Sequence, residues 1–179
     1  MSTILIKNGT LIDGSGSKRY LADIFIENEK IKKIGKLDLT ADKVIDASGK
    51  IVSPGFIDTH SHSDLKVLIE PFVEPKIRQG ITTEILGQDG ISMAPLPEEY
   101  VSSWRKNLAG LDGDSDELKW DWKNTDGYLN LISKTGSGPN ELYLVPHGNI
   151  RMEAMGLEAR VATKKELEKM KEISRREME

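Results

Sequence analysis

Two histidines, His60 and His62, lie two residues apart in the stretch GFIDTHSHSD at positions 55–64. The apolar residues before them predict a short strand over 56–60. Side chains at positions i and i+2 of a strand point to the same face, so both imidazoles could chelate one divalent ion, for which zinc is the natural choice. Taken alone, such a pair is more often two exposed or hydrogen-bonded histidines at the end of a strand.

Two more residues of suitable chemistry follow predicted buried strands. Asp89 comes just after the β-branched run ITTEIL at 81–86, and His147 comes just after LYLV at 142–145. Taken singly, Asp89 fits the cap of a turn and His147 fits a histidine bonded to the backbone. If the strands are parallel, both residues meet the histidine pair at the carboxyl rim of the sheet, where such folds keep their active sites.

The elements that must position these residues are predicted to form an α/β fold. Residues 1–53 read as a small antiparallel β unit, and residues 54–179 read as strands alternating with helices. Helices are expected over 72–79, 98–109 and 125–134. A further helix begins at Thr163, which forms a capping box with Glu166, and its apolar stripe is expected in the core. That stripe comprises Leu167, Met170 and Ile173.

The segment 98–138 carries three tryptophans among acidic and glycine-rich pieces. Packing of an inserted segment is the commoner use of such residues, and ligand binding the rarer one. The acidic run at 112–116 lacks the glycine and glutamate of a calcium loop. It is therefore predicted to be a solvated loop.

Composition excludes several classes of function. The chain of 179 residues has a net charge of −4, which argues against binding to nucleic acid or to an anionic membrane. It has no cysteine, hence no disulfide and no thiolate ligand. The sequence shows no signal peptide, no apolar run long enough to span a bilayer, no phosphate-binding loop and no GxSxG elbow. A cytoplasmic location is expected.

The motif at 55–62 resembles the first metal-binding motif of the amidohydrolase superfamily. Three stretches narrow the resemblance to the N-acyl-D-amino-acid deacylases (D-aminoacylases): GITTEILGQDGIS, LYLVPHGNIRMEAMG and ARVATKKELEKMKEISRREME. The resemblance implies that residues 1–53 form part of a small β-sandwich of the urease type. It implies that residues 54–179 form the first three βα units of a metal-dependent (β/α)8 barrel.

The resemblance also implies roles for individual residues. His60 and His62 match ligands of zinc, present as one or two ions. Asp89 aligns with a position that is a cysteine ligand in D-aminoacylases, and this departure puts the affinity and identity of the metal in question. Asp58 is expected to support the strand end, and His147 to lie near the substrate. Arg151 is a further candidate for contact with the substrate.

The implied reaction is the hydrolysis of an N-acyl-D-amino acid to a D-amino acid and a carboxylate. Two alternatives stay open: hydrolysis of cyclic amides, as in dihydropyrimidinases or dihydroorotases, and a non-catalytic fragment that only binds metal. The catalytic acid–base group is expected beyond residue 179. The chain is accordingly expected to be an inactive fragment of a longer enzyme, whose partner is a small-molecule substrate. A homo-oligomer is left open.

Overall fold

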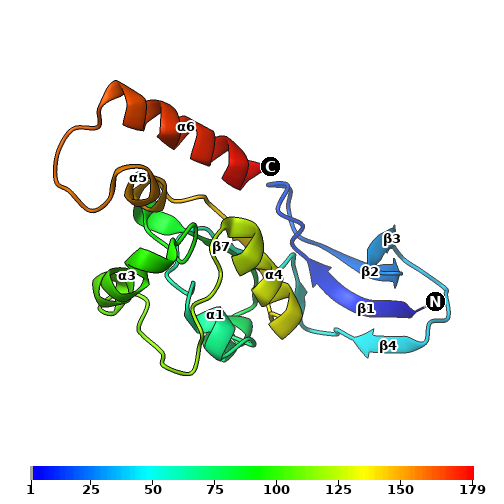
Figure 1. The fold of residues 1–179 in the computed structure, drawn as a ribbon. Helices are drawn as coiled ribbons and strands as arrows, with labels where there is room; N and C mark the ends of the chain where they lie inside the picture. The colour runs from blue at the N-terminus through cyan, green and yellow to red at the C-terminus, as the bar shows by residue number, and fades with distance from the viewer. Residues whose placement is uncertain (1) are drawn as a thin grey trace. The chain divides into compact units, whose positions relative to one another are not determined.

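The computed structural model describes residues 2–179, which divide into two compact units at Pro54 and Gly55. The first unit is a sheet with the strand order β3-β2-β1-β4, in which β5 also pairs with β1 (Figure 1). Its strands are β1 (Thr3–Leu11), β2 (Tyr20–Glu27), β3 (Lys30–Gly35), β4 (Lys43–Asp46) and β5 (Ile51–Val52).

The sequence predicted an antiparallel unit, but the first unit is only partly antiparallel. β1, β2 and β3 form an antiparallel meander, but β4 and β5 both run parallel to β1. The connection 36–42 carries the chain from β3, at one edge of the sheet, to β4, on the other side of β1. A short hairpin turn could not span this distance. Asp42 ends this connection and accepts hydrogen bonds from the backbone N–H and the hydroxyl of Thr3. The parallel pairing therefore depends on a crossover without turn signals.

The second unit contains a parallel sheet with the order β6-β7-β8. Its strands are β6 (Phe56–Asp58), β7 (Ile81–Leu86) and β8 (Asn140–Tyr143). Its helices are α1 (Lys66–Ile69), α2 (Glu74–Ile77), α3 (Val101–Leu108), α4 (Thr125–Thr135), α5 (His147–Met155) and α6 (Lys164–Met178), with short 3-10 turns η1 (Gln88–Gly90) and η2 (Glu98–Tyr100). The predicted alternation of parallel strands with helices is thus confirmed for three strands.

Several boundaries differ from the prediction. β6 ends at Asp58, so the histidine pair lies in the loop just past the strand rather than on it. The helix expected over 72–79 is only four residues long, with Pro75 in its first turn, and α5 was not predicted. In α6 the capping box at Thr163 is confirmed, and Met170 and Ile173 are buried, whereas Leu167 is 46% exposed.

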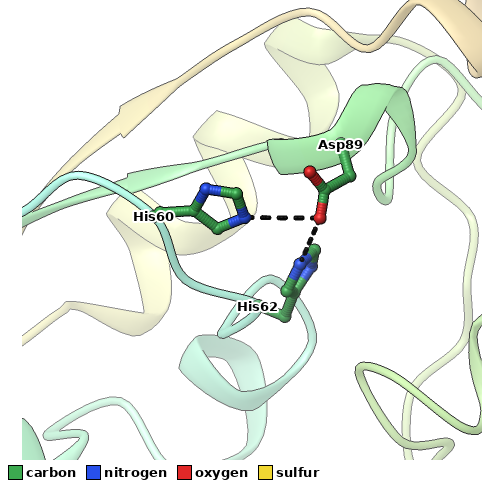
Figure 2. Close-up of side chains that lie close together, drawn as sticks. All are labelled: His60, His62 and Asp89. Atoms are coloured by element: carbon green, nitrogen blue, oxygen red, sulfur yellow. Dashed lines mark hydrogen bonds and ion pairs between the residues drawn. The ribbon is translucent and has the colours of Figure 1, made fainter.

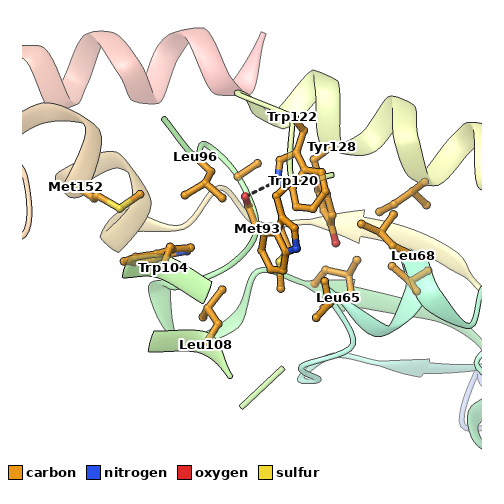
Figure 3. Packing of buried hydrophobic residues seen from close by; sticks show 14 of the residues in the cluster. Leu65, Leu68, Met93, Leu96, Trp104, Leu108, Trp120, Trp122, Tyr128 and Met152 are labelled. Carbon is orange, nitrogen blue, oxygen red and sulfur yellow. Dashed lines mark hydrogen bonds between the residues drawn. The ribbon is translucent and has the colours of Figure 1, made fainter. Parts of the chain in front are cut away.

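The three tryptophans pack into the main core of the second unit (Figure 3). The indole N–H of Trp104 donates to the carbonyl of Ser92, and that of Trp122 to the carbonyl of Met93, each at 2.7 Å. Asn149 binds the same segment, accepting from the N–H of Ser92 and donating to two of its carbonyls. Because a buried polar group must find a partner, these bonds fix the chain that follows η1. The prediction that the tryptophans serve packing is confirmed.

Among residues 2–179, no helix combines the length and the apolar character that crossing a membrane requires.

Candidate metal centre

The structure brings the three predicted metal ligands together at the carboxyl ends of β6 and β7. Figure 2 shows both imidazoles directed at the carboxylate of Asp89. The Nε2 atoms of His60 and His62 lie 3.3 Å and 3.1 Å from Asp89 Oδ2. The two imidazoles meet edge to face, with ring centroids 5.8 Å apart. Both Nε2 atoms therefore lie within hydrogen-bond distance of the same carboxylate oxygen.

The spacing of these atoms fits a zinc ion. Tetrahedral nitrogen and oxygen ligands at zinc bond lengths of roughly 2.0–2.2 Å stand about 3.3–3.5 Å from one another. The two observed nitrogen–oxygen separations, 3.1 and 3.3 Å, lie close to that spacing. Two imidazoles and one carboxylate also form a known donor set for catalytic zinc, which uses three protein ligands and leaves a fourth position open. The residues present therefore suit the metal that the sequence indicates.

The three side chains differ in exposure. Those of His60 and Asp89 are 61% and 58% exposed, whereas that of His62 is only 18% exposed. Hydrogen bonds from His60 and then His62 lower the pKa of Asp89, so its carboxylate stays charged. An anionic ligand with two neutral imidazoles gives the cluster the negative charge that favours a divalent cation.

The turn that carries Asp89 has little freedom to change. Asp89 itself has a φ of +57°, a conformation that aspartate tolerates better than most residues. Gly87 precedes it with a φ of +80°, and a Cβ at Gly87 would lie 2.1 Å from the carbonyl oxygen of Leu144. Only glycine satisfies both conditions, and the backbone of Leu144, just after β8, lies against the turn and sets its position.

Two side chains tie the histidine loop to this turn. The amide of Gln88 donates to the carbonyls of Thr59 and Ile85, at 2.9 and 3.0 Å. Asp64 is buried; its Oδ1 accepts the backbone N–H of Gly87 at 2.8 Å and a hydrogen bond from the hydroxyl of Ser92. Burial is the main cause that raises the pKa of Asp64. The bond between Gln88 and Thr59 and that between Gly87 and Asp64 join residues that are 29 and 23 positions apart in the sequence.

Asp58 is the last residue of β6 and precedes the histidine loop. Its Oδ1 accepts the backbone N–H of His60 at 3.2 Å, and its Oδ2 accepts the ammonium of Lys76 at 2.9 Å. Lys76 also forms an ion pair with Glu84, whose side chain is fully buried. The bond from Lys76 is the main cause that lowers the pKa of Asp58. The carboxylate thus holds the backbone at which the histidine loop begins.

Two further residues of the predicted site, His147 and Arg151, are not part of this cluster. His147 is exposed at the first position of α5, where a Cβ added to Gly90 would lie 4.0 Å from its Cβ. The guanidinium of Arg151 donates to the carbonyls of Glu158 and Arg160, in the connection from α5 to α6. The geometry places His147 beside the turn of Asp89 and gives Arg151 backbone partners; the roles of both residues remain predictions.

One residue near the cluster escaped the sequence analysis. Asp112 belongs to the acidic run predicted to be solvated, yet its side chain is only 1% exposed, and its Oδ1 lies 3.7 Å from Nδ1 of His62. The prediction is wrong for Asp112, because the loop after α3 folds inward at this point. It is correct in part for Asp114 and Asp116, which are 42% and 96% exposed and pair with Arg105. Burial, followed by the nearby Asp64, raises the pKa of Asp112 to about 7.

Comparison with known proteins supplies the class. The sequence profile described as "Amidohydrolase family" matches residues 43–179, and the chain belongs to that family. It is 34% identical over 176 residues to a D-aminoacylase of Alcaligenes xylosoxydans xylosoxydans, covering 98% of this chain and 35% of the relative. A shorter match of 68 residues is 59% identical to a 5-methylthioadenosine/S-adenosylhomocysteine deaminase of Thermococcus sibiricus, covering 37% of this chain and 16% of that protein.

The fold is also similar to that of a solved enzyme. The crystal structure of an N-acyl-D-glutamate deacylase from Bordetella bronchiseptica, complexed with zinc and a phosphonate inhibitor, matches with a TM-score of 0.83 and 31% identity. The match covers 98% of this chain and 36% of that structure. The chain thus spans about a third of the length of these deacylases. The predicted resemblance to their N-terminal portion is confirmed.

Proposed function

We propose that this chain supplies the first part of a zinc-dependent amide hydrolase that converts an N-acyl-D-amino acid and water into a D-amino acid and a carboxylate. The observation that carries the proposal is the convergence of His60, His62 and Asp89 at zinc-ligand spacing. The deacylases of similar sequence and fold support the choice of substrate class.

Zinc held by these three residues would act as a Lewis acid on the amide carbonyl and lower the pKa of water. The chain's own residues prepare the site. Asp58 fixes the backbone of His60, and Gln88 joins the histidine loop to the turn of Asp89. We assign His147 to the neighbourhood of the substrate, because α5 begins beside that turn. The group that moves a proton to the leaving amine is assigned to chain beyond residue 179.

A complete (β/α)8 barrel is part of the proposal. β6, β7 and β8 are parallel, as barrel strands are. Phe56, Ile57 and Leu142 on these strands are 61%, 61% and 51% exposed, which is unusual for apolar strand residues. Further strands would cover them. The first unit would then be part of the β-sandwich that accompanies the barrel.

Zinc binding tests the metal centre directly. We expect the chain to bind one zinc ion through the cluster and His60→Ala to weaken binding at least 100-fold, because two ligands hold zinc poorly. His147→Ala is the matched control and should change the dissociation constant less than twofold. Competition with a chromophoric chelator measures both. Equal affinity for the wild type and His60→Ala would refute the centre.

Substrate class is tested on the protein purified from its source. We expect hydrolysis of N-acetyl-D-methionine and none of N-acetyl-L-methionine or hydantoin. Deamination is the second candidate, favoured by the 59% identity over 68 residues to a deaminase. Ammonia release from S-adenosylhomocysteine, without hydrolysis of the N-acyl substrate, would replace the first candidate with the second.

A further inference from the structure

The two nitrogens of His62 have different surroundings. Nε2 faces Asp89 at 3.1 Å, as a metal-ligating atom should. Nδ1 is buried and has no hydrogen-bond partner among residues 2–179. Oδ1 of Asp112 lies 3.7 Å from this nitrogen. The inner side of the imidazole is therefore directed at a carboxylate that has no other evident task.

Asp112 is the second half of this arrangement. Its side chain is 1% exposed, and neither carboxylate oxygen has a hydrogen-bond partner among the described residues. A buried carboxylate without a partner is costly, so its presence calls for an explanation. The loop is held inward by its neighbours: Arg105 binds both carboxylate oxygens of Asp114, and the indole of Trp120 donates to the carbonyl of Ser115.

We propose that Asp112 is the positioning residue of the metal centre: it accepts a hydrogen bond from Nδ1–H of His62 and so keeps Nε2 free of its proton and directed at the metal. This inference rests on the proposed metal centre. Neutral imidazole carries one proton, and the partner of one nitrogen decides whether the other has a free lone pair. A closing movement of about 0.5 Å brings the two atoms within hydrogen-bond distance.

The same groups invite a competing explanation, a second cation. His62, Asp64 and Asp112 offer ligand atoms within 4.8 Å of one another. However, binding one cation through Nδ1 and another through Nε2 would remove the only N–H proton of the neutral ring and leave an imidazolate. Asp64 is also committed, since its Oδ1 already accepts bonds from Gly87 and Ser92. A hydrogen bond from Nδ1–H of His62 to Asp112 therefore explains the arrangement better than a second cation between them.

Nitrogen chemical shifts of the imidazole of His62, measured by long-range proton–nitrogen correlation at pH 8.5, test the assignment without metal. The proteins compared all carry Asp89→Ala, which removes the competing acceptor at Nε2. In this background we expect the Nδ1–H form to predominate while Asp112 is present and the Nε2–H form in Asp112→Leu, which replaces the acceptor with an apolar side chain of similar size. Asp116→Asn is the control in the same loop and should keep the Nδ1–H form. The Nε2–H form in Asp89→Ala with Asp112 intact would overturn the proposal.

Zinc affinity gives a second readout. Loss of an orienting carboxylate typically weakens metal binding 10- to 100-fold, which is the expected effect of Asp112→Leu, against less than twofold for Asp116→Asn. Circular dichroism confirms that each variant is folded. Unchanged affinity in Asp112→Leu would overturn the proposal. So would the loss of one of two bound ions with the other unaffected, which would make Asp112 a ligand. Failure of the wild type to bind zinc would refute the metal centre, while the chemical shifts still decide the role of Asp112.

Discussion

Two polar clusters lie near the carboxyl ends of β6 and β7, and they differ in how their donors are paired. We call Asp58, Lys76 and Glu84 the lower cluster, and His60, His62 and Asp89, which follow the strands, the upper cluster. In the lower cluster, the ammonium of Lys76 binds Asp58, Ser61 and Glu84, so its donors are used within the protein, whereas Oε1 of Glu84 has no hydrogen-bond partner among the described residues. In the upper cluster, His60 and His62 compete for one oxygen of the exposed Asp89. A cation whose donors are all used stabilises a fold, whereas convergent donors short of partners suit a ligand. This difference in pairing assigns a structural role to the charges of the lower cluster and ligand binding to the upper cluster.

Lys76→Met should produce the largest effect, and it concerns stability. The variant leaves Glu84 buried without its cation and removes one partner of Asp58. Removing one member of a buried ion pair costs roughly 3–5 kcal/mol, which we expect as the fall in unfolding free energy by urea denaturation. Lys66→Met removes an exposed pair with Glu70 and should cost less than about 0.5 kcal/mol. Equal costs for the two variants would erase the distinction between the clusters.

Gly87→Ala should give the second largest loss of stability, because it disturbs the turn that packs against the backbone of Leu144, just after β8. Its Cβ would meet the carbonyl of Leu144 at 2.1 Å in addition to the strain of a positive φ. We expect a loss of about 3 kcal/mol and weaker zinc binding. Gly49→Ala, in a turn of the first unit, has a φ of +72° with nothing within 4 Å and should cost only about 1 kcal/mol. Similar costs for the two variants would show that the turn of Gly87 is not held by the backbone of Leu144.

Asp89→Cys should change the metal preference of the upper cluster and leave the lower one intact. A thiolate is a softer ligand than a carboxylate, so we expect zinc affinity to rise about tenfold relative to the affinity for Mn²⁺. Competitive titration of both ions measures the ratio. Asp116→Cys, in an exposed position of another loop, should leave it unchanged. A ratio insensitive to Asp89→Cys would remove Asp89 from the set of ligands.

Glu141→Gln should give the smallest effect, which is a change in how the free energy of unfolding depends on pH. Burial is the main cause that raises the pKa of Glu141 from 4.5 to about 7. The folded protein therefore binds more protons than the unfolded chain between pH 4.5 and 7, and stability declines as pH rises through this window. Because the group is partly exposed, we expect a contribution of about 1 kcal/mol, absent in Glu141→Gln. Parallel stability curves for the two proteins would contradict this assignment.

The sequence predicted the upper cluster better than the lower one. His60, His62 and Asp89 each follow a strand, and the rule that parallel strands share a rim was enough to gather them. Lys76 and Glu84 gave no such signal, because their pairing depends on how α2 packs against β7. Asp112 could not be found in this way, since the run DGDSD has the composition of a solvated loop. Its burial is set by contacts made elsewhere in the same loop.

The hydrogen bonds of Gln88 have a consequence for the entropy of ion capture. Its amide joins the carbonyls of Thr59 and Ile85, so the loop of His60 and His62 and the turn of Asp89 behave as one body. Three donors already fixed in place lose little freedom when an ion arrives. The arrangement is a chelate built from separate parts of the chain, and removing that amide would weaken binding entropically while leaving every ligand atom in the protein.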